Sequence, residues 1–175
     1  RAIFSGNICV WKSISIVTPQ KYFTLNINDD STIINSYNKN NEIITTKQFS
    51  ELTNSNITKY SNNFIVYGNK NNMLSIYIID ENLKIINSKD TDIMVDINSK
   101  ATIYANDEKF YVLLTDEGIL SDTNLYEFDS SLNVTINKMS SYKNEELTSI
   151  LKSDYYLLHM TSTKLNESIA YYLSS

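Results

Sequence analysis

The stretch Ile57-Thr-Lys-Tyr-Ser-Asn-Asn-Phe-Ile-Val-Tyr-Gly68 joins two short β-type runs through a polar turn. β-Branched and aromatic residues favour strands, and Ser-Asn-Asn between two such runs is typical of a tight turn. Three other stretches repeat this pattern. In each, the second run begins with a large apolar residue, at Ile8, Phe110 and Tyr155. The sequence therefore predicts a repeated β-hairpin.

Each copy extends into a longer unit. A third run follows, such as Leu74-Ser-Ile-Tyr-Ile-Ile, and in three units it leads into an acidic turn, at 28–31, 80–82 and 129–131. A fourth run follows in the first three units, so the expected strand count is four, four, four and three. The predicted organisation is one all-β domain, 1–175, with units at about 1–37, 57–88, 101–138 and 147–175. An elaborated loop is expected at 38–56, with one or two helical turns at 45–52.

A unit of about 45 residues with four short strands has the size of a β-propeller blade. Runs such as Phe110-Tyr-Val-Leu-Leu and Leu125-Tyr-Glu-Phe-Asp resemble the blades of WD40, quinoprotein and sialidase-like propellers. The resemblance implies an all-β propeller-like fold of about four blades, as a four-bladed ring or part of a larger one. A β-sandwich of the lectin or galectin kind has strands at similar spacing and is the alternative. The sequence contains no Trp-Asp dipeptide closing a third strand, no sialidase Asp box and no kelch Gly-Gly pair.

The propeller resemblance also implies where a ligand would bind. Loops between the second and third strands, and from each fourth strand to the next unit, would share one face. Long loops on a rigid scaffold often carry function, and this face would include 13–21, 38–56, 69–73 and 115–124. The predicted binding residues on it are Tyr37, Phe49, Asn71, Asp116, Glu117, Asp122 and Tyr142.

Charge and composition argue against several classes of partner. The net charge is -5, and the 15 basic and 20 acidic residues are evenly spread. A nucleic-acid-binding protein would cluster its basic residues, so no nucleic acid is expected. No apolar run is long enough for a transmembrane helix, so no membrane insertion is expected. With three glycines in total, Walker and Rossmann loops are excluded, and no cofactor is predicted.

The sequence contains no recognisable catalytic set. His159 and Cys9 are the sole residues of their types and lie in apolar runs, where structural roles are expected. One histidine cannot build a multi-histidine zinc site, and the paired acids fall in turns. Arg1 is the sole arginine, whereas the sialidase resemblance would imply an arginine cluster. No catalytic or metal residues are therefore predicted. A segment of a glycan-active enzyme with its catalytic groups elsewhere is an alternative.

These observations predict a non-catalytic binding or scaffold domain that recognises a protein or a glycan. If the fold is a sandwich, the alternative is a viral or pathogen surface attachment domain. The abundance of Asn, Ile and Tyr is typical of an AT-rich genome and favours the surface of a pathogen or virion over the cytoplasm. Because the fourth unit has three runs, pairing with a second segment or copy of the chain is also expected.

Overall fold

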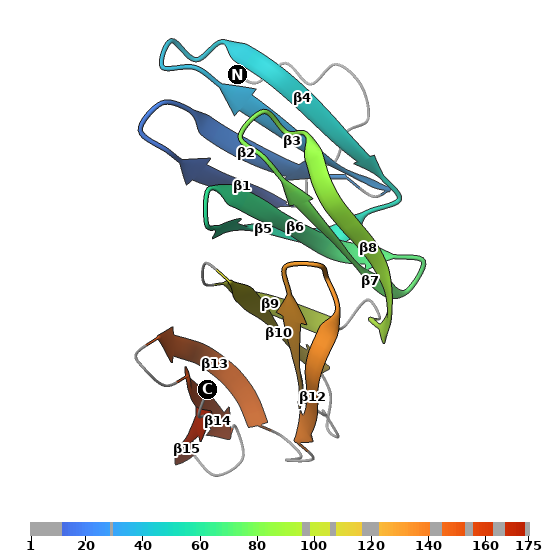
Figure 1. Cartoon of the computed structure of the whole chain (residues 1–175), viewed down its shortest axis with the longest axis vertical. Helices are drawn as coiled ribbons and strands as arrows, with labels where there is room; N and C mark the ends of the chain where they lie inside the picture. The colour runs from blue at the N-terminus through green and yellow to red at the C-terminus, as the bar shows by residue number, and fades with distance from the viewer. Residues whose placement is uncertain are drawn as a thin grey trace, which may run out of the picture. The chain divides into compact units, whose positions relative to one another are not determined.

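The computed structural model describes residues 12–28, 30–95, 99–105, 108–116, 123–140, 145–152, 156–162 and 167–173. Every regular element in these ranges is a β-strand, and the strands form four antiparallel sheets (Figure 1). The chain divides into two compact units, 1–97 and 98–175, with two sheets each. Within the described ranges there is no helix that could cross a membrane.

Each sheet is a meander whose strands pair with their neighbours in sequence. The first sheet contains β1 (Lys12–Val17), β2 (Tyr22–Ile27), β3 (Ser31–Tyr37) and β4 (Ile43–Ser50). The second contains β5 (Thr53–Tyr60), β6 (Asn63–Lys70), β7 (Met73–Ile79) and β8 (Ile85–Met94). The third contains β9 (Ser99–Ala105), β10 (Lys109–Asp116), β11 (Thr123–Asp129) and β12 (Val134–Ser140). The fourth contains β13 (Glu145–Lys152), β14 (Tyr156–Ser162) and β15 (Glu167–Leu173).

The predicted boundaries of the first unit are wrong. The loop expected at 38–56 contains β4 and the start of β5, and residues 45–52 form no helical turn. The run of β-branched residues from Ile43 to Thr46 explains why this segment is a strand. Likewise, the stretch 13–21 contains most of β1. The first sheet therefore spans 12–50 in the described residues rather than 1–37.

A turn of one geometry follows the third strand in each of the first three sheets. It begins with an Asn or Asp whose Oδ1 accepts two backbone N–H groups, from residues two and four positions later, at 2.8–3.0 Å. Its fourth residue is left-handed, with φ between 62° and 66°. The pairs of first and fourth residues are Asn38 with Asn41, Asp80 with Leu83, and Asp129 with Leu132.

The recurrent turn shows which residues of one sheet correspond to which residues of the next. A leucine with positive φ is strained, and the burial of Leu83 and Leu132 in apolar surroundings offsets that cost. The counterpart of the turns at Asp80 and Asp129 is the one at Asn38, between β3 and β4. The acidic turn at 28–31 joins β2 to β3 and belongs to a different position in the unit.

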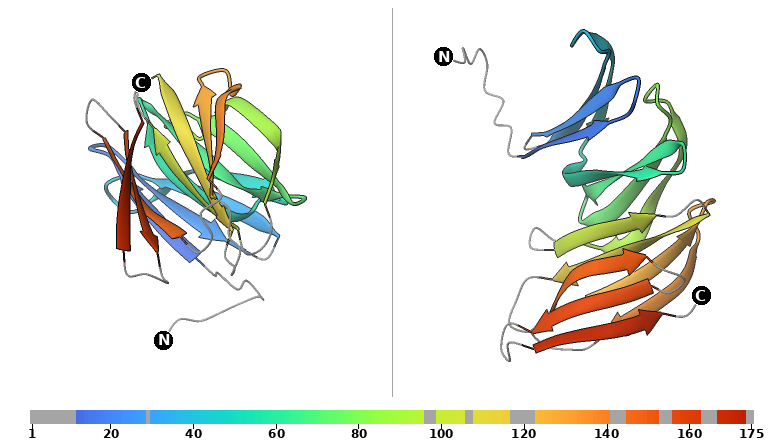
Figure 2. Two further views of the ribbon diagram at one scale, coloured as in Figure 1. Left: turned by 90° about the horizontal axis from the view of Figure 1, so that it is seen from below. Right: turned by 90° about the vertical axis from the view of Figure 1, so that its left-hand side faces the viewer.

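The first two sheets lie side by side (Figure 2). Buried apolar residues from both sheets form one shared core. Phe23 in β2 and Phe64 in β6 occupy the second position of their strands, and their ring centroids lie 4.8 Å apart. Phe110 holds the same position in β10 of the third sheet. Each of these rings is at most 1% exposed, which identifies the position as a core site of the repeat.

The two sheets of residues 12–95 differ in how many faces they bury. In β2, Phe23 and Leu25 are buried, whereas Tyr22 and Thr24 between them are half-buried. Such alternation is typical of a strand with one covered face. In β6 every residue from Phe64 to Gly68 is buried, as expected for a strand covered on both faces.

Gly68 allows β5 to approach β6 closely. A Cβ at this position would lie 2.7 Å from the carbonyl oxygen of Thr53 and 3.0 Å from the Cα of Ser55. The approach coincides with an irregularity in β5, where the pairing register shifts between Thr53 and Asn56. A residue without a side chain is therefore required here by space, because backbone atoms of β5 fill the position of the Cβ.

Candidate functional site

The connections of residues 12–95 lie at two ends of the sheets. At one end, which we call the loop end, lie residues 28 and 30 between β2 and β3, and the turns 51–52 and 71–72. The N–H of Glu51 donates to the carbonyl oxygen of Asp30 at 2.8 Å, and the N–H of Val95 donates to that of Asn72 at 3.0 Å.

At the opposite end lie the turns 18–21, 38–42 and 80–84. Lys21 Nζ joins two of these turns by donating to Asn82 Oδ1 at 3.1 Å. These contacts separate the connections that were expected to share a single binding face: the turns 18–21 and 38–42 lie at one end, and the turns 51–52 and 71–72 lie at the other.

The predicted binding residues are therefore not all together. Asn71 is exposed at the loop end, in a turn whose two central asparagines have φ of 54° and 62°. Phe49 lies near that end, but its ring is 4% exposed and packs 4.8 Å from the ring of Tyr77. Its prediction as a loop residue is wrong, because it is the inward-facing residue of β4. Tyr37 lies at the opposite end.

The remaining predicted residues belong to 98–175. Asp116 is the last residue of β10, next to the connection that leads to β11. Glu117, Asp122 and Tyr142 lie outside the described residues. The loop prediction for these positions therefore stays a prediction.

An ion pair lies at the loop end. Lys70 Nζ is 2.9 Å from Asp90 Oδ2, and the hydrogen bond between them raises the pKa of Lys70 and lowers that of Asp90. Burial raises the pKa of the nearby Tyr77. All three groups therefore hold their ordinary charge state at neutral pH. None of them has the shifted pKa that a general acid or base requires.

The half-buried face of the first sheet is mainly polar and aromatic, with two aliphatic residues, Ile33 opposite Asn26 and the exposed Val17 opposite Tyr22. We call its residues Tyr22, Thr24, Asn26, Asn35 and Tyr37 the tyrosine face. The two tyrosines are direct cross-strand partners, and their rings stack with centroids 4.6 Å apart and planes inclined by 4°.

Hydrogen bonds fix the tyrosine face. The Tyr22 hydroxyl donates to Asn41 Oδ1 at 3.1 Å, and the Thr46 hydroxyl of β4 donates to Asn35 Oδ1 at 2.8 Å. The Thr24 hydroxyl and the phenol of Tyr37 lie 3.5 Å apart. Two rigid aromatic rings, with amides and hydroxyls beside them, are a surface suited to recognition.

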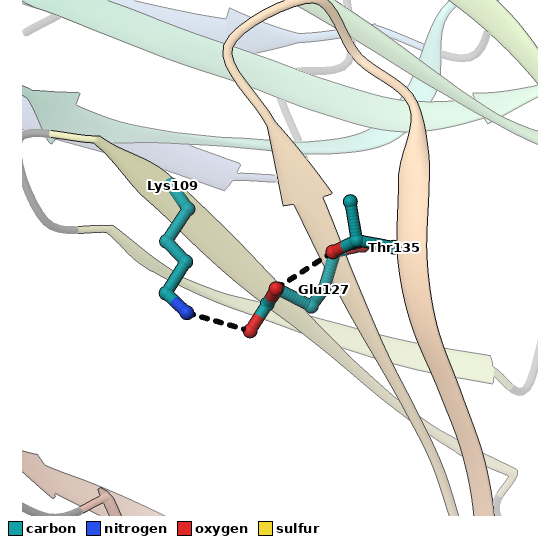
Figure 3. Close-up of polar contacts among 3 residues, drawn as sticks. All are labelled: Lys109, Glu127 and Thr135. Carbon is teal, nitrogen blue, oxygen red and sulfur yellow. Dashed lines mark hydrogen bonds and ion pairs between the residues drawn. The ribbon is translucent and has the colours of Figure 1, made fainter. Parts of the chain in front are cut away.

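A buried carboxylate lies in the third sheet (Figure 3). Glu127 of β11 is 8% exposed, and its two carboxylate oxygens accept hydrogen bonds from Lys109 Nζ at 3.0 Å and from the Thr135 hydroxyl at 2.6 Å. Burial acts to raise the pKa of Glu127, but hydrogen bonds from Thr135, Tyr111 and Lys109 outweigh it, and the net pKa is lowered. Glu127 is thus a paired, ionised carboxylate.

The described residues contain no group of three or more His, Cys, Asp and Glu side chains placed to hold a metal ion. Sequence reasoning named Tyr37 as a binding residue, but it found neither the rest of the tyrosine face nor the Glu127 cluster. The alternation of Tyr-Phe-Thr-Leu-Asn-Ile in β2 carries a signal for the tyrosine face, because it places every second residue on one side. No signal in the sequence pairs Glu127 with Lys109, since the pairing depends on the register of β10 against β11.

No family model matches the sequence, and no curated protein matches it. Several solved structures are similar to the chain, and two of them are described here. One is a subtype N10 neuraminidase-like protein of A/little yellow-shouldered bat/Guatemala/060/2010, at 11% identity and a TM-score of 0.56, covering 93% of this chain and 59% of that one. The other is an acylaminoacyl peptidase of Pyrococcus horikoshii, at 9% identity and a TM-score of 0.51, covering 94% of this chain and 33% of that one.

Both similar proteins contain β-propellers. The fold is propeller-like. This confirms the predicted fold class, and each four-stranded meander corresponds to a blade. The chain spans less than two thirds of either protein, and at such low identity the likeness concerns the fold alone.

Proposed function

We propose that the chain is a non-catalytic binding domain that recognises a protein through the tyrosine face. One observation carries the proposal: this blade face is neither apolar, like both faces of β6, nor a random polar surface. It presents two stacked tyrosines with their hydrogen-bonding neighbours held in place. Tyrosine supplies a large amphipathic contact area at a small entropic cost, which suits a protein interface.

The non-catalytic part of the proposal rests on the state of the ionisable groups. Glu127 and Asp90 are both paired with lysines and have lowered pKa values, so each is held as a carboxylate. A glycosidase of the common kind needs one carboxylic acid that stays protonated beside a second carboxylate. Neither cluster offers such a pair among the described residues.

Site-specific photocrosslinking in the cells that express the chain tests the proposal. A benzophenone amino acid replaces Ser15, which is exposed and pairs with Thr24 beside the tyrosine face. The matched control carries it at Lys59, which is exposed on β5. We expect a discrete protein adduct from position 15 and none of that mass from position 59. In the same background, Tyr37→Ser should remove the adduct, and Tyr37→Phe, which keeps the ring, should retain it.

Three outcomes would overturn the proposal. The first is the absence of any adduct specific to position 15. The second is retention of the chain on a glycan array that Tyr37→Ser abolishes, which would identify a glycan as the ligand instead. The third is turnover of glycosides that is lost in Glu127→Gln or Asp90→Asn, which would show that the chain is an enzyme.

A further inference from the structure

A row of three residues recurs across the first three sheets, beside the recurrent turn. In each sheet, the residue directly before the turn on the third strand has one partner on the second strand and one on the fourth. In the order of second, third and fourth strand, these residues are Tyr22, Tyr37 and Ile43; Phe64, Ile79 and Ile85; and Phe110, Phe128 and Val134. We call them the apolar row of each sheet. The turn therefore aligns the tyrosine pair with positions that are apolar in the other two sheets.

The apolar row is covered in the second and third sheets. Phe64 and Ile79 are buried, and Ile85 packs against the core shared by the first two sheets. Phe110 and Phe128 are also buried, and their rings stack with centroids 5.1 Å apart and planes inclined by 2°. The stacked tyrosines of the first sheet thus repeat a pairing of rings that is buried in the third.

The first sheet has the same row without a cover. Tyr22 and Tyr37 are half-buried, and Ile43 is 59% exposed. Val17, which pairs with Tyr22 on β1, extends the row to the fourth strand and is 78% exposed. An exposed line of aromatic and aliphatic side chains therefore crosses all four strands of the first sheet.

The second sheet shows what kind of surface covers such a row. Its row packs against the opposite face of the first sheet, where the ring of Phe23 lies 4.8 Å from that of Phe64. Two positions before the turn residue, Tyr77 takes the place that Asn35 has in the first sheet, and its ring lies 4.8 Å from that of Phe49. The cover of an apolar row in this chain is therefore the apolar face of an antiparallel sheet.

The surroundings of the tyrosine face carry no charge. The exposed residues that flank it on the two outer strands are Ser15, Val17, Ile43, Thr46 and Gln48. None of them is charged, although the chain has 35 charged residues and a net charge of -5. Depletion of charge is typical of the core of a protein interface.

The polar groups of the face largely satisfy one another. The Thr46 hydroxyl bonds to Asn35, the Tyr22 hydroxyl bonds to Asn41, and the Asn26 amide lies 3.5 Å from the Thr24 hydroxyl. A buried polar group is costly when it has no partner. Because these groups already have partners within the sheet, an apolar surface can cover them at a small cost.

We propose that the tyrosine face binds the apolar face of an antiparallel β-sheet in another protein, stacked on the first blade as the first blade is stacked on the second. The inference rests on the proposed function, which makes this face the protein-binding surface, and it specifies the class of partner. The contact extends across all four strands, from Val17 to Ile43. A second copy is a poor occupant, since the apolar sheet faces within residues 12–95 are already buried inside the chain.

Photocrosslinking from both outer strands of the first sheet tests the extent of the contact. Ser15 on β1 and Gln48 on β4 are exposed on the same side of the sheet, and the two strands are about 14 Å apart, or three strand spacings. With a benzophenone amino acid at either position of the full chain, in the cells that express it, we expect the same protein adduct. Mass spectrometry should map both crosslinks to strands of one sheet in the partner. Lys59 again provides the control position and should give no such adduct.

A charge at either end of the row tests the contact independently of the tyrosines. Val17→Asp and Ile43→Asp should each reduce the adduct formed from the opposite outer strand by about tenfold or more, because an unpaired charge would be buried against an apolar sheet. The matched control is Ile86→Asp, since Ile86 is an aliphatic residue of β8, outside this face, and is 55% exposed. This variant should crosslink as the wild type does. Circular dichroism of each variant confirms that the fold is retained.

Several results would overturn the stacked sheet. An adduct from one outer strand alone would do so, as would crosslinks that map to a loop or a helix of the partner. Loss of the adduct in Tyr37→Ser but not in Val17→Asp and Ile43→Asp would also contradict it. In these three cases the tyrosine face still binds a protein, so the proposed function stands.

Two further results concern the identity of the partner. An adduct made of two copies of the chain would show that the occupant is a second copy, and would overturn the assignment to another protein. The absence of any adduct from both outer strands would overturn the proposed function together with this inference.

Discussion

Strands β2 and β6 hold the same place in neighbouring blades, yet they differ in how many of their faces are buried. Both have phenylalanine at the second position, and these two rings meet in the core. After it, β2 alternates Thr, Leu, Asn and Ile, whereas β6 continues with Ile, Val, Tyr and Gly. The blade of β2 has one apolar face, and the blade of β6 has two. The number of covered faces, rather than strand propensity, therefore sets the composition of a strand in this chain.

The sharpest test of this comparison uses the matched residues Ile65 and Thr24, which follow the two phenylalanines. Ile65→Ala should lower the free energy of unfolding by about 2–5 kcal/mol, because it leaves a cavity in a fully buried site. Thr24→Ala should cost less than about 1 kcal/mol, since it removes two long hydrogen bonds, with Tyr37 and Asn26, from a half-buried face. Urea denaturation measures both, and equal losses would refute the one-face assignment of β2.

A second test concerns the last residue of the aligned stretch, Ile27 in β2 and Gly68 in β6. Gly68→Ala should cost about 1–3 kcal/mol, as expected for overpacking, because its Cβ would meet backbone atoms of β5. The control Ile27→Val removes one methylene from a buried site and should cost about 0.5–1.5 kcal/mol. If Gly68→Ala proves neutral in thermal unfolding, β5 does not approach β6 as closely as described.

The buried charge of the third blade gives a third test. Glu127→Gln should cost about 1–2 kcal/mol at neutral pH, because hydrogen bonds to a charged group are replaced by bonds to a neutral one. The folded-state pKa of Glu127 is lowered, so its stabilisation is present above its pKa in the unfolded chain and is lost as the pH falls below that value. The difference between wild type and variant should therefore shrink in acid. A difference that is independent of pH would contradict the ionised state.

The smallest effect is expected at the rim of the second blade. Asp90→Asn breaks the pair with Lys70, but the Asp90 side chain is 57% exposed, so water screens the interaction. The loss of stability should stay within about 0.5 kcal/mol, fading at low pH because the folded pKa of Asp90 is also lowered. A loss as large as that of Glu127→Gln would mean that exposure does not separate the two ion pairs.

Much of the fold could be predicted from the sequence, because the repeat is visible in short local patterns of strand and turn residues. The polar turn before Phe64 and the acidic turns at Asp80 and Asp129 mark strand ends directly. The first blade was misaligned because its recurrent turn begins with Asn38, and its Asn-rich sequence resembles a loop. Phe49 was placed on the surface for the same reason. The alternation in β2 marks one face of that strand, but the pairing of Tyr22 with Tyr37 and of Glu127 with Lys109 depends on which strands lie opposite, and no local pattern specifies that.

The meander order of the strands has a consequence for how the chain is made. Every strand in the four sheets pairs only with its neighbours in sequence, so the formation of a sheet requires no segment from a distant part of the chain. Contacts that are local in sequence close quickly, and a blade can form as soon as its own residues have been synthesised. The first blade then exposes Phe23 and its apolar neighbours, and the second blade packs against them as it folds. Folding is therefore expected to proceed during translation, one blade after another, from the N-terminal side.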